Sequence, residues 1–187
     1  MEAPALPPRR RTIIGIDPGK TGAISVLTCG GGADDELEVI DMPTIDVCVS
    51  GKLRKAIHIR SLLEFFDILQ YQSPDLVVLE KVGAMPGQSG MFDFGYGVGV
   101  LKTILTLHCL HVEEPGPAVW KKALKVPPAK KPDMKKVAVA RAEQLFPKDA
   151  HKFRDTSASV KGAVKDGRAE AALLALWGVQ FLQESGR

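Results

Sequence analysis

Cysteine, histidine and long apolar runs are what this sequence has least of. Its 187 residues include 3 cysteines, Cys29, Cys48 and Cys109, and no two of them stand in a CxxC spacing. An odd and widely spaced set excludes a disulfide framework and a zinc site, and the 4 scattered histidines add no metal-binding pattern. No apolar stretch reaches the roughly 18 residues that cross a bilayer, so we expect no membrane contact.

The length and composition predict one globular domain. Residues 1–11 contain several prolines and arginines and no apolar signal core, which is typical of a disordered leader. Residues 12–187 show no internal repeat and no linker that would divide them, and this length is enough for a full hydrophobic core.

Apolar periodicity predicts an α/β domain whose mixed sheet of about five strands is flanked by helices. β-branched or apolar runs indicate strands at 12–17, 22–28, 37–42 and 76–79, with a short one near 109–113. Helical spacing indicates helices at 57–70, 91–108, 118–126, 135–146 and 167–183. The segment 43–55 looks irregular, and 150–165 looks like a polar, mobile loop.

Two acidic residues directly follow apolar strands. Asp17 ends the first strand before the turn Asp-Pro-Gly-Lys-Thr-Gly, and Glu80 ends the unbroken apolar run Leu76–Leu79. A carboxylate in such a place costs free energy unless it is paired or bound to a cation. Asp17 is therefore either part of the turn's own hydrogen bonding or a metal ligand. Glu80 either emerges into solvent or joins the same site.

The last predicted helix carries two more acids. Asp166 and Glu170 are four residues apart and so share one helix face. Asp166 has an alternative role as a helix cap, whereas Glu170 lies on the apolar stripe of the helix. Like charges gather only around cations, and sets of oxygen ligands suit Mg²⁺, with Mn²⁺ as a substitute. Two such ions about 4 Å apart support in-line hydrolysis of a phosphodiester.

The segment from Trp120 to Arg154 is basic, with eleven Lys and Arg against three acids. It is either a solvated lysine-rich face or a phosphate-binding surface. Trp120 itself is expected in the core rather than as a stacking platform. The lysines concerned are Lys121, Lys122, Lys125, Lys130, Lys131, Lys135 and Lys136.

Five motifs in fixed order resemble the chloroplast Holliday-junction resolvases, the Monokaryotic Chloroplast family, in the RuvC-like branch of the RNase H-like nucleases. They are GIDPGKTGAISVL, LEKVGAMPGQSGMFDFGYGVG, PAVWKKALKV, AEQLFP and DGRAEAALLALWG, and the resemblance covers residues 12–182. It implies an RNase H-like fold and a homodimer that cuts a four-way DNA junction by two symmetric nicks at paired cytosines. It also implies a chloroplast location and a magnesium-dependent endonuclease that uses no nucleotide cofactor.

The resemblance also assigns roles to residues. It implies that the metal ions are held by Asp17, Glu80, Asp166 and Glu170. It implies a lysine near the ions that stabilises the pentacovalent phosphate, for which the candidates are Lys130, Lys131 and Lys135. RuvC places its last two acids three apart rather than four, so the closer ligand of the final pair stays open, with Asp155 a weaker alternative in the polar loop.

The glycine-rich loop after Glu80 is the expected DNA-reading element. Its apolar residues either staple the loop down or enter the open junction centre, offsetting unstacking of a few kcal/mol per step. Gln88 and Ser89 can then read base edges. The predicted DNA contacts are Met85, Pro86, Gly87, Gln88, Ser89, Phe92, Lys121, Lys122, Lys125 and Lys136.

Three other functions share parts of this pattern. A sugar-kinase or actin-like ATPase also opens with a strand, an aspartate and a Gly/Thr turn, but it needs two such domains and a longer chain. A catalytically inactive junction-binding protein would keep the basic surface. An RNase H-like nuclease for flaps or RNA–DNA hybrids would keep the acids.

Overall fold

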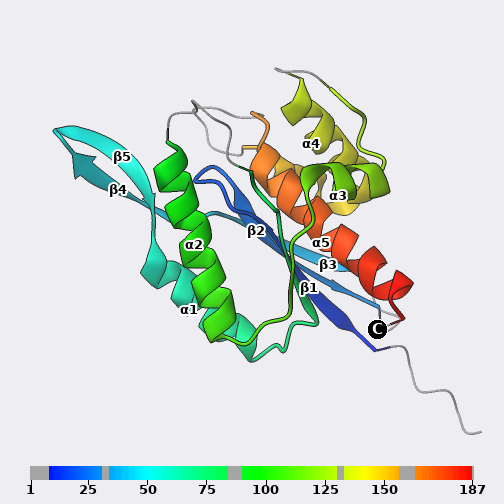
Figure 1. Ribbon diagram of the computed structural model, residues 1–187. Helices are drawn as coiled ribbons and strands as arrows, with labels where there is room; N and C mark the ends of the chain where they lie inside the picture. Colours follow the sequence, from blue (N-terminus) through cyan, green and yellow to red (C-terminus); the bar gives the residue numbers. More distant parts are fainter. Residues whose placement is uncertain (1–8, 31–33, 84–89, 130–132, 156–162, 187) are drawn as a thin grey trace, which may run out of the picture.

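A mixed five-stranded sheet forms the centre of the protein (Figure 1). This computed structural model describes residues 9–30, 34–83, 90–129, 133–155 and 163–186. The strands β1 (Arg11–Asp17), β2 (Ala23–Cys29) and β3 (Glu36–Asp41) form an antiparallel meander. On the other side of β1, β6 (Leu76–Leu79) and β7 (Val112–Glu113) run parallel to it, so the strand order is β3-β2-β1-β6-β7. The predicted α/β class and mixed sheet are confirmed.

Helices cover both faces of the sheet (Figure 1). On one face lie α1 (Ile59–Gln70) and α2 (Met91–Leu107). On the other lie α3 (Pro117–Ala123), α4 (Met134–Leu145) and α5 (Asp166–Glu184). Alternate side chains of β1 supply the two cores, because Ile13 joins the core under α5 and Ile14 the one under α1. None of the described helices is long and apolar enough to cross a membrane.

The helix α5 approaches β1 so closely that only glycine fits between them. A Cβ atom on Gly15 would lie 2.1 Å from the carbonyl oxygen of Ala171, and Ser25 donates its hydroxyl to the same oxygen at 2.7 Å. A Cβ atom on Gly167 would lie 2.5 Å from the carbonyl oxygen of Thr21. The first turn of α5 is thereby seated against the β1–β2 turn that follows Asp17.

The prediction that residues 43–55 are irregular is wrong. They belong to a hairpin of β4 (Thr44–Val49) and β5 (Lys52–Ile57) that stands beside the start of α2 (Figure 1). Ser50 and Gly51 join the strands with φ of 50° and 75°, as a type I′ turn requires. The hairpin was missed although Ile45, Val47 and Val49 alternate along β4, because this run is short, most of the hairpin is exposed and several of its residues are charged. Ile57 belongs to β5, and α1 therefore starts at Ile59.

The prediction of a polar loop from residue 150 is wrong at its start. Pro147–Phe153 forms a 3-10 helix, η1, and Phe153 is completely buried. One apolar residue per turn is enough to anchor this short element, and that is too weak a pattern to detect. Arg154 and Val164 then form an isolated antiparallel bridge, and residues 156–162 lie outside the described part.

We expect Gly15→Ala to destabilise the protein by about 2 kcal/mol or more, because the added methyl group forces α5 away from β1. Gly95→Ala on α2 is the matched control, since a Cβ atom there meets nothing within 4 Å. The control should leave the free energy of unfolding unchanged or raise it by up to about 1 kcal/mol, because alanine has a higher helix propensity than glycine. Urea unfolding measures both, and equal effects would contradict the close packing of α5.

Candidate active site

The four predicted acidic residues lie near the carboxyl ends of two neighbouring inner strands, and they come from three parts of the fold. Asp17 is the last residue of β1, and Glu80 directly follows β6, the parallel neighbour of β1. The backbone amide of Glu80 donates to the carbonyl of Ile16 at 3.1 Å, which fixes the two strand ends side by side. Asp166 and Glu170 lie in the first turns of α5, whose start is seated on the β1–β2 turn.

The charges of the acidic residues affect one another's pKa. Burial raises the pKa of Asp17 to about 7, with the charge of Glu170 as the next cause and smaller effects from Glu80 and Asp166. The amide of Gly19, which donates to Asp17 Oδ1 at 3.3 Å, opposes this rise. Burial and the charge of Glu170 also raise the pKa of Glu80. Asp17 thus supports the turn and also belongs to the acid cluster, while its role as a metal ligand stays a prediction.

Each of the other three acids has a donor of its own. The indole Nε1 of Trp120 donates to Glu80 Oε1 at 3.0 Å. Lys121 Nζ lies 2.9 Å from Glu170 Oε1, and Lys135 Nζ lies 2.9 Å from Asp166 Oδ2. The contact with Asp166 also raises the pKa of Lys135, so this lysine stays charged.

Each of these three carboxylates is oriented toward its own donor rather than toward a common point. In the described part of the chain, no three His, Cys, Asp or Glu side chains stand close enough together to hold a metal ion. The donor set itself, four carboxylates, suits Mg²⁺ or Mn²⁺ chemically. Metal binding therefore stays a prediction, and it requires Glu170 and Asp166 to turn away from their lysines.

Asp166 does not cap α5. Lys165 occupies the N-cap position, and no side-chain hydrogen bond caps the helix. The alternative acid, Asp155, lies outside the group whose charges act on Asp17. It pairs instead with Lys165 at 3.3 Å.

Of the predicted lysines and DNA contacts, some lie at the acid cluster, some lie away from it, and some fall outside the described residues. Lys135 is at the site, whereas Lys136 pairs with Asp133 on the exposed side of α4 at 3.4 Å. Lys121, expected only as a DNA contact, lies at the site as well, while Lys122 and Lys125 are exposed. Phe92 is 87% exposed in the first turn of α2. Outside the described residues lie Met85, Pro86, Gly87, Gln88, Ser89, Lys130 and Lys131.

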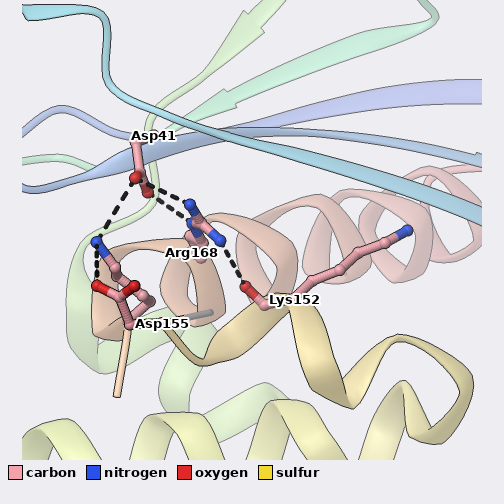
Figure 2. A network of polar contacts seen from close by, with 5 residues as sticks. Asp41, Lys152, Asp155 and Arg168 are labelled. Carbon is pink, nitrogen blue, oxygen red and sulfur yellow. Dashed lines mark hydrogen bonds and ion pairs between the residues drawn. The ribbon is translucent and has the colours of Figure 1, made fainter. Parts of the chain in front are cut away.

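An ion-pair network that sequence reasoning missed fastens the start of α5 (Figure 2). Arg168, which lies between the two acids of α5, donates to Asp41 Oδ1 and Oδ2 at 2.6 and 2.9 Å. Its Nη1 also donates to the carbonyl of Lys152 in η1 at 3.2 Å. Hydrogen bonding from Arg168 lowers the pKa of Asp41. The network joins α5, β3 and η1, and because Asp41 and Arg168 are 127 positions apart in the sequence, no local pattern indicated it.

The chain is similar to known resolvases in its fold. No protein-family model and no curated sequence matches it. Among solved structures, the RuvC of Thermus thermophilus in complex with a Holliday junction substrate matches with a TM-score of 0.55 and 16% identity, over 94% of this chain and 96% of that one. The same RuvC in another structure gives 0.54 and 15%, over 94% and 96%.

A yeast protein gives the same result. The mitochondrial Holliday junction resolvase Ydc2 matches with a TM-score of 0.53 and 16% identity, over 94% of this chain and 82% of that one. At such identities the likeness establishes the fold, which is the RNase H-like fold of the RuvC type. The likeness covers 94% of this chain in each of these structures.

We expect Asp17→Asn to stabilise the metal-free protein at high pH. Between the ordinary pKa of 3.8 and about 7, the folded protein keeps a proton that the unfolded chain has lost. The free energy of unfolding therefore falls as pH rises through this window. The neutral amide avoids this loss, so the variant should gain up to about 4 kcal/mol above pH 7.

Urea unfolding in EDTA across this pH window measures the effect, with Asp46→Asn on the exposed hairpin as the control. The gain of Asp17→Asn should shrink toward zero as pH falls to 4. A gain that does not change with pH would contradict the raised pKa of Asp17.

A double-mutant cycle tests the anchor of α5. Arg168→Gln and Asp41→Asn should each cost about 1 kcal/mol, because the pair is bidentate but half-exposed. The double variant should cost less than the two together, since both remove one interaction. The exposed pair Lys148 and Asp34, 2.7 Å apart, is the control and should show no measurable coupling. Full additivity at Arg168 and Asp41 would mean that the network does not hold α5.

Proposed function

We propose that this protein is a DNA endonuclease that resolves four-way junctions by paired symmetric nicks, as in the Monokaryotic Chloroplast family. The observation that carries the proposal is the group of four acids at one sheet edge, in which Asp17 has a pKa of about 7. Burial, together with the charge of Glu170, makes the charged form of Asp17 costly, which is unfavourable in a purely structural site and useful for binding cations. The fold shared with an RuvC solved with a Holliday junction substrate supports the choice of substrate.

The site suits divalent-metal chemistry through its own residues. Asp17, Glu80, Asp166 and Glu170 would hold Mg²⁺ or Mn²⁺, since all their donor atoms are carboxylate oxygens. Such ions, when bound, supply an activated water and stabilise the leaving oxygen in phosphodiester hydrolysis. Lys135 and Lys121 neutralise the acids in the protein without metal and are freed for DNA when the acids turn to the cations.

The freed lysines face a phosphate-rich substrate. Lys135 keeps its charge and is the described candidate for stabilising the pentacovalent phosphate. A groove of about 650 Å³ between α3 and α4 has an apolar lining that includes Val126, Pro127 and Ala138. Lys121, Lys122 and Lys125 also line it and would contact the DNA backbone. We also propose base reading and the cytosine preference for residues 84–89, which lie outside the described part, and the role of an apolar wedge for the exposed Phe92.

Two symmetric nicks require two active sites, so the proposal includes a homodimer. An apolar hollow of about 480 Å³ lies between α1 and α2, lined by Leu63, Tyr96, Val100 and Leu107. Leu107 is 70% exposed and Tyr96 is 56% exposed, as expected for a surface that a second copy covers. A chloroplast nucleoid location rests on the motif resemblance alone.

Junction nicking mapped to single nucleotides tests the proposal. Wild-type protein should nick a labelled four-way junction symmetrically in Mg²⁺ and should cut flaps, RNA–DNA hybrids and linear duplex more slowly. Glu170→Gln should lower the nicking rate at least roughly 100-fold, because an acid of the cluster is lost. Junction binding in EDTA should persist, and Glu64→Gln on the exposed face of α1 is the control with unchanged nicking.

Each other outcome contradicts part of the proposal. Loss of binding together with nicking in Glu170→Gln would show that the acid is structural. Faster cutting of flaps or hybrids would indicate a different nuclease of the same fold. Binding with no nicking in any divalent ion would indicate an inactive junction-binding protein.

A further inference from the structure

Trp120 combines a core position with a polar contact at the acid cluster. Its side chain is completely buried, in the same apolar cluster as Leu124, Phe153 and Leu173. Its indole Nε1 nevertheless reaches the surface of that core and donates to Glu80 Oε1 at 3.0 Å. A buried indole N–H needs an acceptor, and the hydrogen bond described for it goes to this acid.

The main chain around Glu80 is fixed on both sides. The amide of Glu80 donates to the carbonyl of Ile16, and the amide of Lys81 donates to the carbonyl of Pro115, each within 3.1 Å. Pro115 lies in the segment that leads into α3, the helix of Trp120. The strand end and the helix are therefore held together by backbone contacts, which leaves the side-chain torsions of Glu80 as its remaining freedom.

The indole removes much of that freedom. A carboxylate has two oxygens, and one can accept the indole proton while the other remains for a cation. The donor is neutral, so it orients Glu80 without competing with a cation for its charge, unlike the lysines at Glu170 and Asp166. Partners of this kind fix the orientation of metal ligands in many proteins.

The next residue strengthens the arrangement. Lys121 lies over the ring of Trp120, 4.9 Å from its centroid, and pairs with Glu170. Consecutive residues of α3 therefore contact two of the four acids. A shift of α3 would disturb both contacts, so the helix acts as a support for the cluster as well as a cover for the core.

We propose that Trp120 is a positioning residue that orients Glu80 for divalent-cation binding. The proposal rests on the function proposed above, in which Glu80 is a metal ligand. Loss of such a partner typically weakens metal binding about 10- to 100-fold. The effect acts on the cation rather than on DNA, so junction binding in EDTA should not depend on the indole N–H.

The chain offers a matched pair of substitutions, because it contains only 2 tryptophans. Trp120→Phe keeps an aromatic ring in the core and removes the N–H. Trp177→Phe makes the same change on α5, where the ring stacks on Phe181 at 5.2 Å between centroids. It also leaves Trp120 as the single indole, whose fluorescence then reports on the site directly.

Mn²⁺ binding to the DNA-free full chain, followed by electron paramagnetic resonance, is the first measurement. Trp120→Phe should weaken Mn²⁺ binding about 10- to 100-fold and raise the Mg²⁺ midpoint of nicking by a similar factor. Trp177→Phe should leave both unchanged. In Trp177→Phe, Mn²⁺ should quench the Trp120 emission with the midpoint of Mn²⁺ binding, and a further Glu80→Gln change should remove this quenching.

The outcomes separate this proposal from the proposed function. Mn²⁺ affinity at the wild-type level in a folded Trp120→Phe protein would overturn the positioning role. If that variant does not fold, Trp120 emission in Trp177→Phe that Mn²⁺ leaves unchanged overturns it instead. Glu80→Gln that still binds Mn²⁺ and nicks normally would overturn the metal site itself. If Glu80→Gln loses both Mn²⁺ binding and nicking while Trp120→Phe keeps both at the wild-type level, only the positioning role would be overturned.

Discussion

The burial of acidic side chains close to one another is the constraint around which this end of the molecule is organised. Burial beside Glu170 lifts the pKa of Asp17 to about 7, which shows how unfavourable its charged form is without a cation. The protein limits this cost with donors rather than with distance. Lys121 and Lys135 compensate the charges of Glu170 and Asp166, and the neutral indole of Trp120 donates a hydrogen bond to Glu80.

That compensation depends on a rigid scaffold. Gly15 lets α5 lie against the backbone of β1, and the pair of Arg168 with Asp41 ties the first turn of α5 to β3. Gly15 lies on the strand that ends in Asp17 and faces Ala171, and Arg168 lies two residues after Asp166. Both contacts therefore fix the positions of the acids. The close approach and the ion pair are therefore parts of the site's geometry as much as of the fold's stability.

Sequence reasoning located the strongly apolar strands and the amphipathic helices, and it missed the exposed β4–β5 hairpin. The runs that became β1 and β6 are apolar on both faces, which is the pattern expected of central strands covered by helices on both sides. The β4–β5 hairpin is exposed, and its Ser50–Gly51 turn was a weaker signal than an apolar face. Apolar character also placed Trp120 in the core, yet no pattern states which way an indole N–H points.

The lysines at the acid cluster bear on how the proposed reaction would begin. Lys135 and Asp166 hold each other only while no stronger partner is present, because an exposed ion pair contributes little stability. A divalent cation attracts the carboxylate more strongly, and a phosphate attracts the released ammonium. Cation and DNA would therefore favour each other's binding, since each takes one half of a pair that the free protein keeps together. Glu80 differs in that its donor is neutral and buried, so its orientation would persist through the exchange.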